Sequence, residues 1–95
     1  MAKNGLPAAY WQDMPTTDFD AAVTGNWIAV LPVAAIEQHG PHLPVATDTA
    51  IAEGMIEASI ARLPEDLPAT FLPLQQIGKS NEHISSPGTL THSWE

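Results

Sequence analysis

The stretch that decides the fold is Trp27-Ile28-Ala29-Val30-Leu31-Pro32-Val33, a continuous apolar run. Its apolar residues do not alternate with polar ones, which favours a strand covered on both faces, as in a parallel sheet flanked by helices. Pro32 has no N–H group to donate to a neighbouring strand, so we place it near the end of this one. The run predicts a strand over residues 27–33.

A helix and a second apolar segment follow this strand. Thr47 or Asp48 opens a predicted helix over about residues 49–63, and Pro64 ends it. Residues 69–74 (Ala-Thr-Phe-Leu-Pro-Leu) are predicted to form a second buried strand. Strand, helix and strand in this order indicate a βαβ unit of an α/β protein. Ligands of such sheets bind beyond the carboxyl ends of the strands, where the loops 34–48 and 75–89 begin.

The chain before the first strand predicts less regular structure. Residues 1–16 are expected to form an irregular arm because they contain a glycine and two prolines. Thr17 or Asp18 is predicted to cap a short helix that runs to about Thr24, with Gly25 as its stop.

Composition argues against a nucleic-acid partner and against cysteine metal ligands. Three basic residues against eleven acidic ones give a formal charge of −8. Such a surface repels phosphate backbones and attracts cations, so we expect no nucleic-acid partner. There are no cysteines, so any metal must be bound by nitrogen and oxygen atoms.

Two further features of the sequence concern its cellular location and the extent of its domain. No apolar run approaches the ~18 residues of a membrane span, and no signal-peptide pattern follows Met1, so we expect a cytoplasmic protein without a membrane partner. The chain stops after the Pro87-Gly88-Thr89 turn, where a new helix could begin. We therefore expect residues 1–95 to be the N-terminal part of a longer domain.

The first loop carries the residues that predict chemistry. It reads Glu37-Gln38-His39-Gly40-Pro41-His42-Leu43-Pro44-Val45-Ala46-Thr47-Asp48. Carboxylate and imidazole groups at the end of a strand are suitable ligands for zinc or manganese. Glu37 and His39 are two residues apart, which places their side chains on the same side of an extended loop. Asp48, at a helix N-terminus, could bridge two metals ~3.5–4 Å apart.

A simpler interpretation stays open for each of these residues. The acids and histidines of the first loop could be solvated, with Asp48 acting only as a helix cap and His42 as a packing or supporting histidine. The second loop contains the neighbouring pair Glu82-His83. Adjacent side chains point in different directions, which favours substrate contact over a shared metal, and a plain surface loop is the alternative.

These motifs resemble a known family. Residues 31–44 (Leu-Pro-Val-Ala-Ala-Ile-Glu-Gln-His-Gly-Pro-His-Leu-Pro), continuing to Thr47-Asp48, resemble the signature of the creatininase (creatinine amidohydrolase) family. The second loop, with Ser80, Glu82-His83 and Pro87-Gly88-Thr89, resembles that family's next shared segment. The resemblance covers about residues 10–95. It implies a three-layer α/β/α fold with a mostly parallel sheet, of which this chain holds only the first βαβ part.

The resemblance also implies the site. It suggests two divalent metal ions, zinc and/or manganese, with Glu37 on one ion, His39 on the other and Asp48 bridging both. We assign Ser80, Glu82 and His83 to substrate contact. The implied reaction is hydrolysis of a C–N amide bond in a small cyclic or formylated molecule by a metal-activated water, in a homo-oligomer, typically a hexamer.

Departures from the family pattern define the open alternatives. The pattern usually has glycine where this chain has Ala34 and Ala46, and aromatics where it has Ile77 and Ser86, which puts creatinine itself in doubt. The family's further His and Glu ligands lie beyond Glu95, so the 95-residue chain alone is expected to be inactive. A chain that naturally ends at Glu95 would instead be a non-catalytic metal-binding or assembly module, or would take its missing ligands from another chain.

Overall fold

The computed structural model describes residues 1–93. The chain divides into two compact units, which are described separately: Met1–Leu31 with Ile56–Pro73, and Pro32–Met55 with Leu74–Glu95. Helix α2 (Thr47–Arg62) begins in the second unit and ends in the first. Among the described residues, none of the helices combines the length and the apolar character that crossing a bilayer requires.

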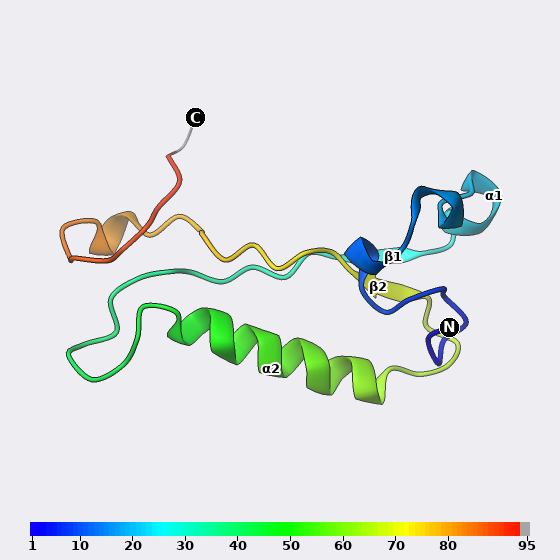
Figure 1. Ribbon diagram of the computed structural model, residues 1–95, viewed down its shortest axis with the longest axis horizontal. Coiled ribbons are helices and arrows are strands. Elements are labelled where there is room, and N and C mark those ends of the chain that lie inside the picture. The colour runs from blue at the N-terminus through cyan, green and yellow to red at the C-terminus, as the bar shows by residue number, and fades with distance from the viewer. Residues whose placement is uncertain (94–95) are drawn as a thin grey trace. The chain divides into compact units, whose positions relative to one another are not determined.

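The first unit contains a small parallel sheet (Figure 1). Strand β1 (Ile28–Val30) pairs with β2 (Ala69–Phe71) so that Ile28 faces Ala69 and Val30 faces Phe71. All of β2 is buried, as predicted, and it forms the core together with Leu6 and Met14. The predicted order of strand, helix and strand is therefore confirmed as a small α/β arrangement.

Strand β1 is less covered than its apolar sequence predicts. Ile28 is 47% exposed, and Leu31, directly after the strand, is 56% exposed. Within residues 1–93, β1 has a single neighbour in a two-stranded sheet, so its apolar faces lack the flanking layers that a buried parallel strand requires. The prediction of a strand covered on both faces is wrong for the described part of the chain.

The helices differ from the predictions at their starts. Helix α2 begins at Thr47, so Asp48 lies in its first turn and not before it. Helix α1 (Ala21–Thr24) is preceded by a separate 3-10 turn, Thr16–Asp18, so the predicted cap at Thr17 or Asp18 is wrong. Phe19 lies between the 3-10 turn and α1 and has a non-helical backbone conformation, with φ −100° and ψ 62°. The centroid of its ring lies 4.6 Å from that of the Trp11 ring.

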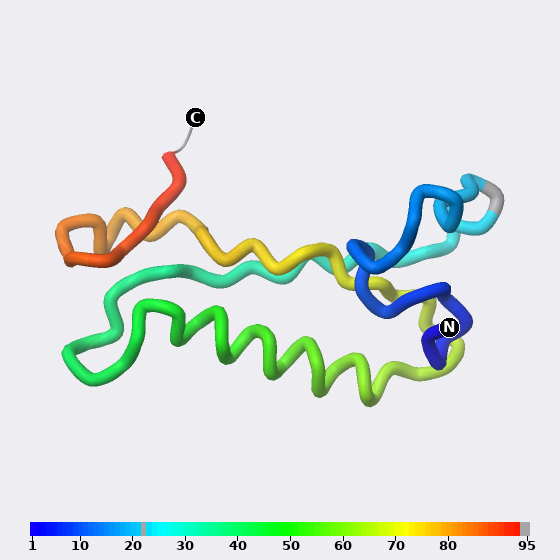
Figure 2. The backbone as a smooth tube through the Cα atoms, in the orientation of Figure 1, coloured from blue at the N-terminus to red at the C-terminus, as the bar shows by residue number. Residues whose placement is uncertain are grey.

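The second unit holds the two loops that the sequence predicted to share one edge. The Gln75 N–H donates to the Pro32 carbonyl at 3.0 Å, and the Ala34 N–H donates to the Gln75 carbonyl at 2.9 Å. Farther along, the Leu90 N–H donates to the Ile36 carbonyl at 2.8 Å. Residues 32–36 therefore run beside parts of the second loop, as the tube in Figure 2 shows. The prediction that the loops lie together is confirmed.

Candidate metal centre

The first loop folds back on itself and returns to the start of α2. The Glu37 N–H donates to the Val45 carbonyl at 3.1 Å, and His39 pairs with Leu43 in an antiparallel bridge. Gly40 makes the turn between them with φ +79°, a conformation that side chains with a Cβ rarely adopt. The turn places Glu37 and His39 beside the first turn of the helix.

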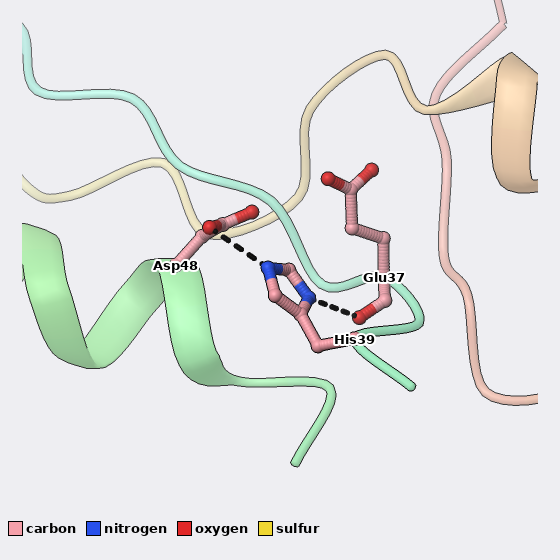
Figure 3. Close-up of side chains that lie close together, drawn as sticks. All are labelled: Glu37, His39 and Asp48. Atoms are coloured by element: carbon pink, nitrogen blue, oxygen red, sulfur yellow. Dashed lines mark hydrogen bonds and ion pairs between the residues drawn. The ribbon is translucent and has the colours of Figure 1, made fainter. Parts of the chain in front are cut away.

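His39 is held at both of its ring nitrogens. Its Nδ1 atom lies 3.0 Å from the main-chain oxygen of Glu37, and its Nε2 atom lies 3.2 Å from Asp48 Oδ1 (Figure 3). A carbonyl oxygen can only accept, so Nδ1 carries a hydrogen. The Nε2 atom of the neutral ring is then a bare lone pair that faces a carboxylate oxygen.

Two acceptors that face each other at this distance require a cation between them. Without a metal, a proton on Nε2 can be this cation. The pKa of His39 is accordingly raised, chiefly by the hydrogen bond to the Glu37 carbonyl and further by the negative charge of Asp48. The side chains of His39 and Asp48 are 23% and 35% exposed, so water and ions can reach them. A metal ion would satisfy the same pair of atoms.

The donor set fits a divalent metal. Ligand atoms of Glu37, His39 and Asp48 all lie within 4.8 Å of one another. Two ligand atoms at ~2.0–2.1 Å from a tetrahedral zinc are about 3.3 Å apart. The observed 3.2 Å between His39 Nε2 and Asp48 Oδ1 matches that spacing. A main-chain carbonyl on the other ring nitrogen is also the usual support for a metal-binding histidine. The three residues picked out by the sequence are therefore brought together, and their action as ligands stays a prediction.

The second loop places its three predicted residues differently. Glu82 is exposed and His83 is half-buried at the 3-10 turn Asn81–His83. Their ligand atoms lie within 4.8 Å of each other and of Glu37, so this turn makes neighbouring side chains converge. Ser80 is only 1% exposed, and its N–H donates to Thr91 Oγ1 at 2.8 Å.

Gln38 is a site residue that the sequence pattern did not indicate. Its side-chain nitrogen lies 3.1 Å from His83 Nδ1, and its main-chain N–H donates to Thr89 Oγ1 at 3.1 Å. Gln38 therefore links the two loops. Its position between Glu37 and His39 is the signal that could have identified it, although a neutral amide suggests no chemistry by itself. Of the described residues, His42 is exposed and lies outside both groups of potential ligands.

Comparison with known proteins places the chain in a family. The sequence pattern of the family described as "Creatininase: Creatinine amidohydrolase" matches residues 12–95. A protein of Mycolicibacterium smegmatis named mycofactocin precursor peptide peptidase is 39% identical over 66 residues, which is 67% of this chain and 27% of that protein. The protein of the same name from Mycobacterium tuberculosis is 43% identical over 68 residues, covering 65% and 27%.

A third relative of that name, from Mycobacterium ulcerans, is 37% identical over 81 residues, covering 79% of this chain and 32% of the relative. The chain thus spans about a third or less of the curated relatives that it matches. No solved structure matches the chain significantly. The match over residues 12–95 confirms the resemblance carried by the two loops, and the chain belongs to the creatininase (creatinine amidohydrolase) family.

Proposed function

We propose that the protein is a metal-dependent hydrolase of C–N amide bonds, with its metal centre at Glu37, His39 and Asp48. The observation that carries the proposal is the Nε2 lone pair of His39, which faces the Asp48 carboxylate at 3.2 Å while a carbonyl holds Nδ1. Family membership supports the choice of amide hydrolysis among the reactions that such a centre could perform.

The three residues would divide two divalent ions between them, zinc and/or manganese. Glu37 would bind one ion, His39 the other, and Asp48 both. When bound, such ions supply a water of lowered pKa and polarise the amide carbonyl. The protein residues would hold the ions at the turn between the first strand and α2. The main-chain carbonyl of Glu37 would keep His39 in the tautomer that leaves Nε2 free to bind.

The substrate side of the site is assigned to the second loop. Glu82 and His83 lie near Glu37, so a substrate bound at the metals would meet them. Direct contact with Ser80 stays a prediction that requires the loop to open, since that residue is 1% exposed. The name of the relatives favours a peptide as the first substrate to test, beside the small cyclic and formylated amides expected from the sequence.

We also propose that residues 1–95 are the N-terminal part of one creatininase-like domain with three α/β/α layers, in a cytoplasmic homo-oligomer. The matched stretches make up only 27% of the length of these relatives. Exposed apolar residues such as Leu31 and Val33, at 56% and 68%, are suited to be covered by further layers or subunits. The remaining metal ligands would come from that additional chain.

The experiment is an amide-hydrolysis assay on the protein made from its complete gene. Short peptides, cyclic amides and formylated amines are incubated with untreated, chelator-treated and zinc- or manganese-restored protein. We expect hydrolysis of at least one class, its loss with the chelator and its return with metal. Glu37→Gln removes the activity, whereas His42→Asn retains it. Metal binding without hydrolysis of any class would favour the non-catalytic module instead.

A further inference from the structure

The side-chain amide of Gln38 has a fixed orientation. Its Oε1 atom accepts a hydrogen bond from the main-chain N–H of Gly40 at 3.0 Å. A main-chain N–H can only donate, so the atom that faces it must be the amide oxygen. The amide NH₂ group therefore faces His83, with Nε2 of Gln38 at 3.1 Å from Nδ1 of the imidazole.

This orientation determines where His83 carries its proton. The NH₂ group donates, so His83 Nδ1 must accept, and the hydrogen of the neutral ring is on Nε2. We propose that Gln38 is a positioning residue that holds His83 as the Nε2–H tautomer, which makes His83 a hydrogen-bond donor and not a cation ligand.

The proposal separates two groups that look alike by composition. His83 lies with Glu37 and Glu82 in a second set of potential metal ligands. In the Nε2–H tautomer, Nδ1 already accepts from Gln38 and Nε2 has no lone pair, so neither nitrogen can bind a metal. In His39 the carbonyl of Glu37 has the opposite effect, because it holds the hydrogen on Nδ1 and leaves Nε2 free.

Both partners of the Gln38–His83 contact are anchored through the main chain. The Gln38 N–H donates to Thr89 Oγ1 at 3.1 Å. The His83 N–H donates to the Ser80 carbonyl at 3.0 Å, and the His83 carbonyl accepts from Ser86 N–H at 2.9 Å. The amide and the imidazole therefore meet with little freedom to rearrange, which suits a contact that selects one tautomer.

The consequence for the reaction rests on the proposed function. A ring nitrogen of His83 lies within 4.8 Å of a carboxylate oxygen of Glu37. A fixed N–H donor on this ring can hydrogen-bond to the carbonyl oxygen of a bound amide and stabilise the negative charge that develops there. Gln38 would act on the reaction only through His83, by keeping that donor in place.

The test is nitrogen-15 NMR of the imidazole rings in the full chain, at a pH where the histidines are neutral. His83 is assigned by the signals that disappear in His83→Asn. We expect the wild-type ring to carry its hydrogen on Nε2. In Gln38→Glu the carboxylate can only accept, so the hydrogen is expected to move to Nδ1. Gln76→Glu adds the same charge at an exposed position and is expected to leave the His83 tautomer unchanged.

Three results would overturn the proposal. They are an Nδ1–H ring in the wild type, an Nε2–H ring that persists in folded Gln38→Glu, and a zinc titration that converts the His83 signals to those of a metal-bound ring. If Gln38→Glu does not fold, Gln38→Met takes its place, with a larger Nδ1–H fraction expected and an unchanged fraction contradicting us. A protein that lacks hydrolase activity would leave the tautomer result intact, so the two proposals fail separately.

Discussion

His39 presents its Nε2 atom to Asp48 Oδ1 at 3.2 Å, while the Glu37 main-chain carbonyl, 3.0 Å from Nδ1, holds the hydrogen of the ring. The first contact joins the loop after the first strand to the first turn of α2. Because both facing atoms are acceptors when the imidazole is neutral, the pair has an affinity for a cation. A proton and a metal ion compete for that place.

Without metal, this pair is expected to make stability depend on pH. The pKa of His39 in the folded chain lies above the ~6.5 of an unfolded histidine. Its contribution is therefore fully present below about pH 6.5 and is lost as the pH rises through the raised, folded-state pKa. With a chelator present, the urea midpoint of the wild type is expected to fall on going from low to high pH, and the fall to be smaller in His39→Asn.

The control for this measurement is His42→Asn, which removes an exposed ring of the same loop. It is expected to keep the wild-type change in midpoint. An equal change in His39→Asn and the wild type would show that the His39–Asp48 pair has no such role.

The two loops approach closely at Gly78, so we expect Gly78→Ala and Gly54→Ala to change the free energy of unfolding in opposite directions. A Cβ at Gly78 would lie 2.8 Å from the Ala34 carbonyl oxygen, which belongs to the main chain and cannot move aside easily. We expect Gly78→Ala to lower the free energy of unfolding by about 1–3 kcal/mol. Gly54→Ala is the matched control: nothing lies within 4 Å of its added Cβ in helix α2.

Gly54→Ala is expected to raise the free energy of unfolding by about 0.5–1 kcal/mol, because alanine is the better helix former. Denaturant titration of both variants gives the comparison. A Gly78→Ala protein as stable as the wild type would mean that the loops do not approach as described.

The buried N–H of Ser80 predicts an effect at Thr91. Thr91 Oγ1 accepts that N–H at 2.8 Å, and Ser80 is 1% exposed. Thr91→Val keeps the shape of the side chain but leaves the donor without its partner, at a cost of about 1–3 kcal/mol. Denaturant titration measures the loss, with Thr17→Val at an exposed position as the control. Equal stabilities of the two variants would contradict the assigned hydrogen bond.

The order of elements could be predicted from the sequence because it depends on local patterns. The apolar run before Pro32 and the run 69–74 give the two strands, and the segment between them forms the helix. The extent to which β1 is buried could not be predicted in the same way. An apolar run indicates that a strand needs flanking layers, and in residues 1–93 the layers beside Ile28 and Leu31 are not formed.

The candidate site could also be predicted only in part from the sequence. Glu37, His39 and Asp48 could be identified because each has a chemistry of its own and the loop must end at the helix start. Gln38 could not, because the function of its neutral amide depends on two contacts, with Gly40 N–H and with the His83 ring, one of which comes from the other loop. The convergence of Glu82 and His83 depends on the 3-10 turn that contains them, which adjacency alone does not predict.

The most direct test of the central claim is calorimetric titration of zinc into the metal-free protein near neutral pH. The wild type is expected to bind zinc, and Glu37→Gln, His39→Asn and Asp48→Asn each to weaken binding by at least about tenfold, which is the cost of losing even a supporting residue of a metal site. His42→Asn is expected to bind as the wild type does. A wild type that binds no zinc, or three variants that bind it unchanged, would contradict a metal centre at Glu37, His39 and Asp48.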